Sequence, residues 1–224
     1  MQECWLYRIN SDKLIVFYNG WGMDENPFLH LKSDEYDVVM FYDYSSLPEK
    51  KIIFQEYKNI FHIGFSFGVF IMGLLFQNEI ININNSNFFL INGSFKMISK
   101  DYGIHPKIFE STLENLSETG VIPFYKNMFF DKKDFQIFMN NKPGRDFNDQ
   151  LRELLRLKEL CESDIFSQSF VKSALICRWD KIIFPIAQKK FCNEKSISYK
   201  EIDSGHFPFF MWKSWDEVLK EFIA

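Results

Sequence analysis

Three residues whose side chains can together perform acyl transfer occur in order along the chain: Ser66, Asp180 and His206. A serine hydroxyl is a poor nucleophile until a neutral imidazole accepts its proton. The imidazole in turn needs a carboxylate, which fixes its tautomer and stabilises its cation. These residue types therefore predict nucleophile, base and acid of a hydrolytic triad, provided that the fold brings them together.

The serine lies in the motif Gly64-Phe65-Ser66-Phe67-Gly68, between an apolar, strand-like run and an apolar helical pattern that continues to Phe76. This arrangement is typical of a nucleophile elbow. The glycines let a strand turn sharply into a helix, whose N-terminus stabilises negative charge that develops beside the serine. An ordinary glycine-flanked turn is the alternative. A membrane span is disfavoured, because the apolar run from Ile60 to Phe76 is shorter than the about 20 residues required.

Asp180 and His206 each follow a predicted strand, as does Ser66. Their order along the chain is that of the α/β-hydrolases and differs from the orders in chymotrypsin and subtilisin. Asp203 is the rival acid, but it lies close to His206 at one strand end. His62, inside the elbow strand, is interpreted as a core residue.

A glycine-rich loop, Asn19-Gly20-Trp21-Gly22-Met23-Asp24, follows the apolar run from Leu14 to Tyr18. Loops at the carboxyl ends of parallel strands build the active sites of doubly wound sheets. An ordinary turn is the alternative. In combination with the elbow, this loop predicts that the backbone N–H of Trp21 contributes to an oxyanion hole.

Strand-like and helix-like patterns alternate over both ends of the chain, which predicts right-handed crossovers and an α/β fold. We expect a mostly parallel, doubly wound sheet of the α/β-hydrolase type with an inserted helical lid. The predicted strands are 5–9 and 13–18, forming an opening hairpin, then 36–42, 60–65, 87–93, 173–177 and 196–202; the predicted helices outside the lid are 48–57, 67–76, 185–191 and 214–223.

The alternation is interrupted from Ser94 to about Ser167. His105-Pro106 predicts a helix start, and Asp149 to Glu159 is an amphipathic helical pattern. We therefore divide the chain into a first core part at 1–93, a helical lid at 94–167 and a second core part at 168–224. The lid's phenylalanines are expected to face an acyl pocket, and its charges to face solvent or a partner.

The composition restricts the class of protein. The 224 residues suit one medium domain, and the net charge of −4 argues against general nucleic-acid binding. The four cysteines have neither zinc-ligand nor disulfide-framework spacing, which favours free thiols in a reducing compartment. The first residues lack a signal-peptide pattern. We expect a soluble cytoplasmic protein without a membrane segment.

Several segments together resemble one family, the BioG-type pimeloyl-acyl-carrier-protein methyl ester esterases of the α/β-hydrolase superfamily. They are the Gly-Trp-Gly-Met-Asp loop, the elbow, Gly103-Ile104-His105-Pro106-Lys107-Ile108-Phe109, Asp180-Lys181-Ile182-Ile183-Phe184-Pro185 and Gly205-His206-Phe207-Pro208-Phe209. The resemblance covers most of the chain. Two residues depart from the related pattern: Phe65, where tryptophan is common, and Asn19, where many hydrolases have histidine. We expect both residues to affect how the substrate fits more than the catalytic steps.

The resemblance implies a serine carboxylesterase that removes the methyl group from pimeloyl-acyl-carrier-protein methyl ester in biotin biosynthesis. It implies that the N–H groups of Trp21 and Phe67 hold the oxyanion, and that no metal or cofactor is needed. The partner is then an acyl-carrier protein. Two alternatives stay open: a general short-chain carboxylesterase or thioesterase with the same triad, and a hydrolase-fold binding module without catalysis.

Because carrier proteins are strongly acidic, a docking face needs local positive charge near the pocket mouth. Arg152 and Arg156 are one turn apart on the predicted lid helix, and Arg145 lies just before it. We expect these three arginines to form the docking face. The alternative is an ordinary solvated helix face, because Asp149, Glu153 and Glu159 lie nearby.

Overall fold

The computed structural model describes residues 1–81, 84–117, 119–163, 165 and 170–223. Within these residues the chain forms one seven-stranded sheet in the order β1-β3-β2-β4-β5-β6-β7. The β1–β3 pair is antiparallel and the other neighbouring pairs are parallel. The strands are β1 (Gln2–Tyr7), β2 (Lys13–Tyr18), β3 (Asp37–Tyr42), β4 (Asn59–Phe65), β5 (Ser86–Ile91), β6 (Val171–Cys177) and β7 (Ser198–Ile202).

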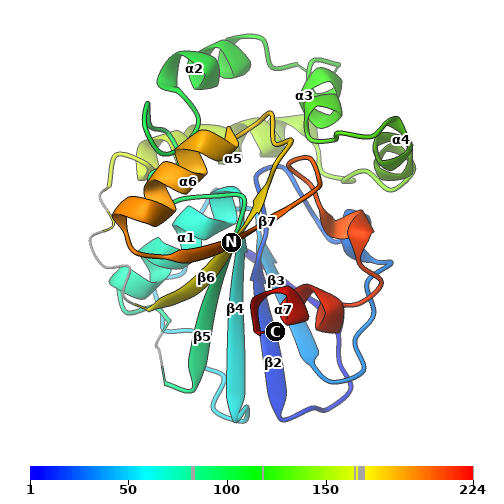
Figure 1. Ribbon diagram of the computed structural model, residues 1–224, viewed down its shortest axis with the longest axis vertical. Coiled ribbons are helices and arrows are strands. Elements are labelled where there is room, and N and C mark those ends of the chain that lie inside the picture. Colours follow the sequence, from blue (N-terminus) through cyan, green and yellow to red (C-terminus); the bar gives the residue numbers. More distant parts are fainter. Residues whose placement is uncertain (82–83, 118, 164, 166–169, 224) are drawn as a thin grey trace.

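Helices cover both faces of this sheet (Figure 1). In β2, Leu14, Val16 and Tyr18 belong to the apolar cluster that also contains α1 (Phe67–Gln77) and α6 (Pro185–Glu194). The alternate residues Ile15 and Phe17 pack into the second cluster with α7 (Trp215–Ile223). Because a central parallel strand is buried on both faces, its sequence is apolar throughout. The predicted mostly parallel α/β sheet is therefore confirmed.

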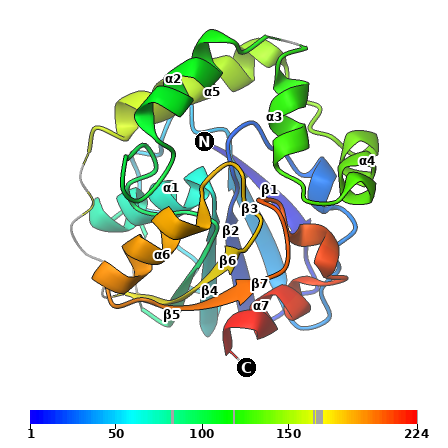
Figure 2. The same ribbon diagram turned by 45° about the horizontal axis from the view of Figure 1, so that its top comes forward.

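Four helices between β5 and β6 lie together beyond one end of the sheet (Figures 1 and 2). They are α2 (Pro106–Glu114), α3 (Val121–Asn127), α4 (Lys132–Asn140) and α5 (Phe147–Leu160). The side chains of His105, Asp131 and Asp146 cap α2, α4 and α5 by accepting backbone N–H groups. We refer to these four helices as the lid. The expected division between 167 and 168 lies outside the described residues.

The opening hairpin predicted from the sequence is wrong. β1 pairs with β3, whereas β2 lies between β3 and β4. The cause is burial: the apolar β2 gains most at the centre of the sheet, whereas the partly exposed β1 suits an edge. β1 also begins earlier than predicted, at Gln2.

The helix predicted over Pro48–Tyr57 is also wrong, because this segment is irregular and contains turns. Its polar groups bond to distant parts of the chain. The N–H of Ile52 donates to the carbonyl of Ile80 at 2.8 Å, and the Tyr57 hydroxyl donates to the Asp37 carboxylate at 2.8 Å. These tertiary contacts override a helical pattern that rested on a few apolar positions.

Candidate active site

Ser66 occupies a strained turn between β4 and α1. Its φ is 53° and its ψ is −125°, a conformation that residues with a Cβ rarely adopt. The flanking glycines are required by close packing. A Cβ on Gly68 would lie 2.0 Å from the carbonyl oxygen of Tyr18, and one on Gly64 would lie 2.7 Å from the Cα of Val69. The motif thus forms the strand–turn–helix that its spacing predicts.

The structure brings Ser66, His206 and Asp180 into one hydrogen-bonded line. The Nε2 of His206 lies 2.9 Å from the Ser66 hydroxyl, and its Nδ1 lies 2.7 Å from a carboxylate oxygen of Asp180. Each of the three residues is at most 6% exposed. With the ring proton on Nδ1, the histidine donates to Asp180 and leaves Nε2 free to accept the serine proton.

Asp203, the rival acid, lies elsewhere. Its carboxylate accepts a hydrogen bond from Arg178 at 2.9 Å, and its side chain is 66% exposed. The carboxylate of Asp180 instead accepts the N–H groups of Ile182 and Ile183 at 2.8 and 2.9 Å. These bonds fix Asp180 on the loop after β6, next to the histidine that follows β7.

Two amide residues that the sequence analysis missed support this arrangement. Gln188 of α6 donates to the Asp180 oxygen that faces His206, at 3.0 Å. Asn92 donates to the carbonyl of His206 at 2.7 Å and accepts the N–H of Cys177 at 2.8 Å. Asn92 directly follows β5 at a φ of 47°, and its position between a strand and Gly93 is a sequence signal that could have revealed it.

Trp21 and Phe67 lie beside Ser66 at the base of a pocket. In the described part of the chain, neither backbone N–H donates a hydrogen bond to another protein group, so both are available to a ligand. Asn19 shapes the loop before Trp21: its side-chain oxygen accepts the Gly20 N–H at 2.8 Å, and its amide donates to the Asp24 carbonyl. Asn19 thus holds the loop through bonds to backbone groups.

The pocket has a volume of about 450 Å³ and lies between the triad and the lid. Ser66 and His206 line its base, and residues of α2, α3 and α5 line its other walls. Of the lid's phenylalanines, Phe109 and Phe124 line the pocket, whereas others such as Phe138 pack in the core. The expectation that the lid's phenylalanines face an acyl pocket therefore holds for a minority of them.

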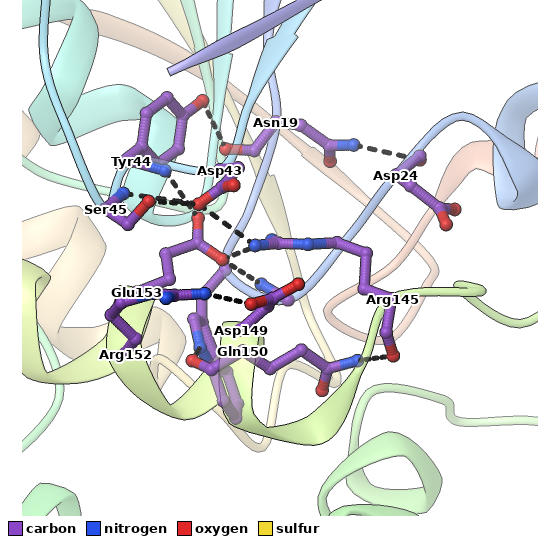
Figure 3. A network of polar contacts seen from close by, with 12 residues as sticks. Asn19, Asp24, Asp43, Tyr44, Ser45, Arg145, Asp149, Gln150, Arg152 and Glu153 are labelled. Atoms are coloured by element: carbon purple, nitrogen blue, oxygen red, sulfur yellow. Dashed lines mark hydrogen bonds and ion pairs between the residues drawn. The ribbon is translucent and has the colours of Figure 1, made fainter.

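Arg145 is not the exposed docking residue that the sequence predicts. Its side chain is 8% exposed and forms ion pairs with Asp43, at 3.0 Å, and with Glu153 (Figure 3). Arg152 and Arg156 do have exposed side chains, at 66% and 43%, and each pairs with an acidic residue of its own helix. Arg145 is buried because α5 presents an acidic side chain to the interior, which needs a cation beside it.

Burial shifts the titration of two groups close to the sheet. It raises the pKa of Glu153, against the opposing effect of Arg145 and of donated hydrogen bonds. It also lowers the pKa of His62 to about 3, which keeps that core imidazole neutral.

Among the described residues no group of three His, Cys, Asp or Glu side chains is arranged to hold a metal ion, and no helix has the length and apolarity to cross a membrane.

The family model described as pimeloyl-ACP methyl esterase BioG matches residues 2–218. The chain belongs to the BioG family. The crystal structure of BioG from Haemophilus influenzae superposes with a TM-score of 0.86 at 25% identity, over 97% of this chain and 99% of that one. The fold is that of α/β-hydrolases: an esterase from Exiguobacterium antarcticum superposes with a TM-score of 0.64 at 17% identity, over 98% and 90% of the two chains.

One relative by sequence is named as a methyltransferase and not as an esterase. A malonyl-[acyl-carrier protein] O-methyltransferase of Bacteroides fragilis is 30% identical over 215 residues, which are 94% of this chain and 41% of that protein. The chain therefore spans less than half the length of this relative. The methyltransferase name describes that longer protein.

Proposed function

We propose that this chain is a serine esterase that hydrolyses the methyl ester of pimeloyl-acyl-carrier protein in biotin biosynthesis. The products are pimeloyl-acyl-carrier protein and methanol. The observation that carries the proposal is the hydrogen-bonded line from Ser66 through His206 to Asp180, whose serine lies at a pocket in a chain of the BioG family. The name of the Bacteroides relative, which acts on a carrier-bound acyl group, agrees with a carrier-protein substrate.

The geometry supports a two-step reaction. The Ser66 oxygen attacks the ester carbonyl while His206 Nε2 takes its proton, and Asp180 stabilises the resulting imidazolium. His206 then protonates the departing methoxide, so methanol leaves and an acyl–serine ester remains. Water, deprotonated by His206, attacks this ester and releases the free carboxylate and Ser66.

Negative charge develops on the carbonyl oxygen in both steps. In this proposal the N–H groups of Trp21 and Phe67 hold that oxygen, since both residues lie beside Ser66 and neither N–H is otherwise bonded. Removal of one such donor typically costs about 3 to 4 kcal/mol of transition-state stabilisation. Phe67 begins α1, whose N-terminus adds a favourable dipole.

The pocket fits an extended acyl chain better than a compact polar substrate. Its walls include Met23, Ile104, Leu116 and Leu154, and its lid side carries Ser111 and Thr112. The chain of a pimeloyl group can lie along the apolar walls while its methyl ester reaches Ser66. Its thioester end then points toward the carrier protein outside.

Lys107 and Lys181 also line the pocket and are exposed, so they add positive charge at its edge.

Release of methanol from pimeloyl-acyl-carrier-protein methyl ester tests this function. We expect turnover by the wild-type chain, and a loss of at least about 10⁴-fold for Ser66→Ala in a protein that keeps its circular dichroism spectrum. Methanol release by Ser66→Ala within tenfold of wild type would exclude the serine mechanism. Hydrolysis of short soluble esters without any turnover of the carrier-bound ester would instead favour a general carboxylesterase.

A further inference from the structure

The lid helix α5 contacts the loop that carries Trp21 through a buried carboxylate. Glu153 is 0% exposed, and one of its oxygens accepts the backbone N–H of Gly22 at 3.1 Å. Its other oxygen accepts the N–H of Tyr44 at 3.1 Å, after the end of β3 (Figure 3). A side chain of the lid thus binds the peptide unit that directly follows Trp21.

The Trp21 side chain is held by the same helix. Its indole N–H donates to the carbonyl oxygen of Gln150 at 2.7 Å, one turn before Glu153 on α5. Trp21 is 5% exposed. The segment Trp21–Gly22 therefore has two attachments to α5, one through a side chain and one through the backbone.

The charge of Glu153 is balanced inside the protein. Arg145 pairs with Glu153 and with Asp43, and its guanidinium is itself almost entirely buried. Among the described residues, the partners of the Glu153 carboxylate are all donors, namely two backbone N–H groups and a guanidinium. The ionised carboxylate is the form that satisfies all three, because a protonated acid would place a donor against a donor. Burial raises the pKa of Glu153, and Arg145 acts against that shift.

We propose that Glu153 is a positioning residue of the oxyanion hole, whose carboxylate holds Gly22 and thereby sets the direction of the Trp21 N–H. This inference rests on the proposed function. An oxyanion donor acts only when it is held within about 0.5 Å of its working position. Gly22 has a φ of 73° and, without a Cβ, restrains the preceding peptide little, so the bond from its N–H to Glu153 helps to fix that peptide. The same contact joins α5 of the lid to the loop that carries Trp21. Movement of α5 therefore moves this loop as well.

The test compares two identical substitutions on α5. Glu153→Gln replaces one acceptor oxygen by an NH₂ group that faces donors, so we expect kcat for a soluble ester to fall about 100-fold with little change in KM. Glu159→Gln is the matched control, because the Glu159 side chain is exposed and its carboxylate pairs with Arg156. Its kcat should stay within about twofold of wild type.

A second readout separates positioning from a general loss of structure. The ester and the corresponding thionoester are compared, since the sulfur of a thionoester accepts weaker hydrogen bonds from oxyanion donors. A misplaced Trp21 N–H lowers the ester-to-thionoester rate ratio, whereas a partly unfolded population lowers both rates equally. If Glu153→Gln does not fold, Glu153→Asp, which keeps the charge but has a shorter reach, takes its place.

The outcomes are distinguishable. A reduced kcat with a reduced ester-to-thionoester ratio supports the proposal. A folded Glu153→Gln or Glu153→Asp chain with the wild-type ratio overturns the positioning role and leaves the esterase function standing. A wild-type chain that hydrolyses no ester overturns both.

Discussion

His206 faces Asp180 and not Asp203, and this choice decides which carboxylate can fix its tautomer. Both aspartates follow strand ends in the sequence, so residue type and spacing alone left Asp203 as a rival. Three-dimensional geometry separates them. Asp180 is buried and bound by backbone N–H groups, whereas Asp203 is exposed and pairs with Arg178.

An asparagine at each position tests this assignment. Asp180→Asn should lower kcat for a soluble ester by about 10⁴-fold, because the amide favours the wrong histidine tautomer and cannot stabilise the imidazolium. Asp203→Asn should leave kcat within about twofold, since it removes an exposed ion pair. Steady-state kinetics of both variants decide the matter. A large loss in Asp203→Asn alone contradicts the triad described above.

Burial of His62 predicts that the free energy of unfolding depends on pH. Burial between Tyr18 and Phe88 lowers its pKa to about 3, whereas an unfolded histidine has a pKa of about 6.5. A depressed folded pKa gives stability that is present above the unfolded pKa and is lost as the pH falls toward the folded one. Between about pH 7.5 and 5 this single group should cost about 2 kcal/mol of unfolding free energy.

The measurement is urea unfolding of wild type and His62→Gln at both pH values. Glutamine keeps an acceptor for the Tyr18 hydroxyl but does not titrate in this range. All other titrating groups are common to the two proteins. We therefore expect wild type to lose about 2 kcal/mol more than the variant on acidification. Equal losses would mean that His62 has the same pKa in the folded and unfolded states, which contradicts the lowered pKa.

At the scale of elements, the nucleophile elbow was predictable because its determinants are local. Gly64 and Gly68 permit the turn, and the apolar residues on either side form β4 and α1. The pairing of β1 was not predictable in the same way, since strand order depends on which apolar strand gains most from the centre of the sheet. Local pattern likewise failed at Pro48–Tyr57, where tertiary hydrogen bonds replace the helix.

The charged residues of α5 show the same limit. The sequence places Arg145, Arg152 and Arg156 near one helix, but a linear pattern does not reveal that Glu153 is buried. Burial of that carboxylate draws Arg145 inward as its counter-ion. Arg152 and Arg156 pair instead with exposed carboxylates of α5 and are themselves exposed.

The contact between α1 and the end of β2 sets a strict limit on residue size. A Cβ on Gly68 meets the carbonyl oxygens of Tyr18 and Asn19, at 2.0 and 2.5 Å, and these are backbone atoms that cannot move independently. We expect Gly68→Ala to lower the unfolding free energy by about 3 kcal/mol or more. In Gly144→Ala the nearest atom lies 3.4 Å away, so its cost should be under about 1 kcal/mol.

Chemical denaturation of the two alanine variants checks this difference. Gly144 is a suitable control because it lies in the loop before α5 and has an ordinary backbone conformation. A Gly68→Ala protein as stable as Gly144→Ala would show that β2 and α1 can separate without cost. The close approach would then be unnecessary for the elbow.

Across the whole molecule, the lid helices lie together beyond one end of the sheet (Figure 2). These helices carry both residues that line the pocket and the exposed Arg152 and Arg156. The net charge is −4, so attraction to an acidic carrier must be local. We propose that Arg152 and Arg156 contribute to that attraction, while Arg145 is excluded by its burial. The counter-hypothesis is a solvated helix face, since both arginines already pair with neighbours on α5.

Reversing the charge of both arginines distinguishes a docking face from a solvated helix face. The double variant Arg152→Glu and Arg156→Glu should raise KM for the carrier-bound ester about tenfold and leave KM for a small soluble ester unchanged. Added salt should weaken turnover of the carrier substrate more than that of the small one. Equal effects on both substrates, or none on either, would place docking elsewhere, with Lys107 and Lys181 at the pocket edge as the next variants to make.

In the proposed reaction, Ser66 attacks the methyl ester of a carrier-bound pimeloyl group and spares its thioester. Intact-mass analysis of pimeloyl-acyl-carrier-protein methyl ester after incubation with the wild-type chain tests it most directly. We predict a carrier protein that has lost the methyl group, still bears the pimeloyl thioester and is accompanied by methanol, with no such product from Ser66→Ala. A carrier returned to its free thiol, with the methyl ester intact on the released acid, would rule out this reaction and identify a thioesterase.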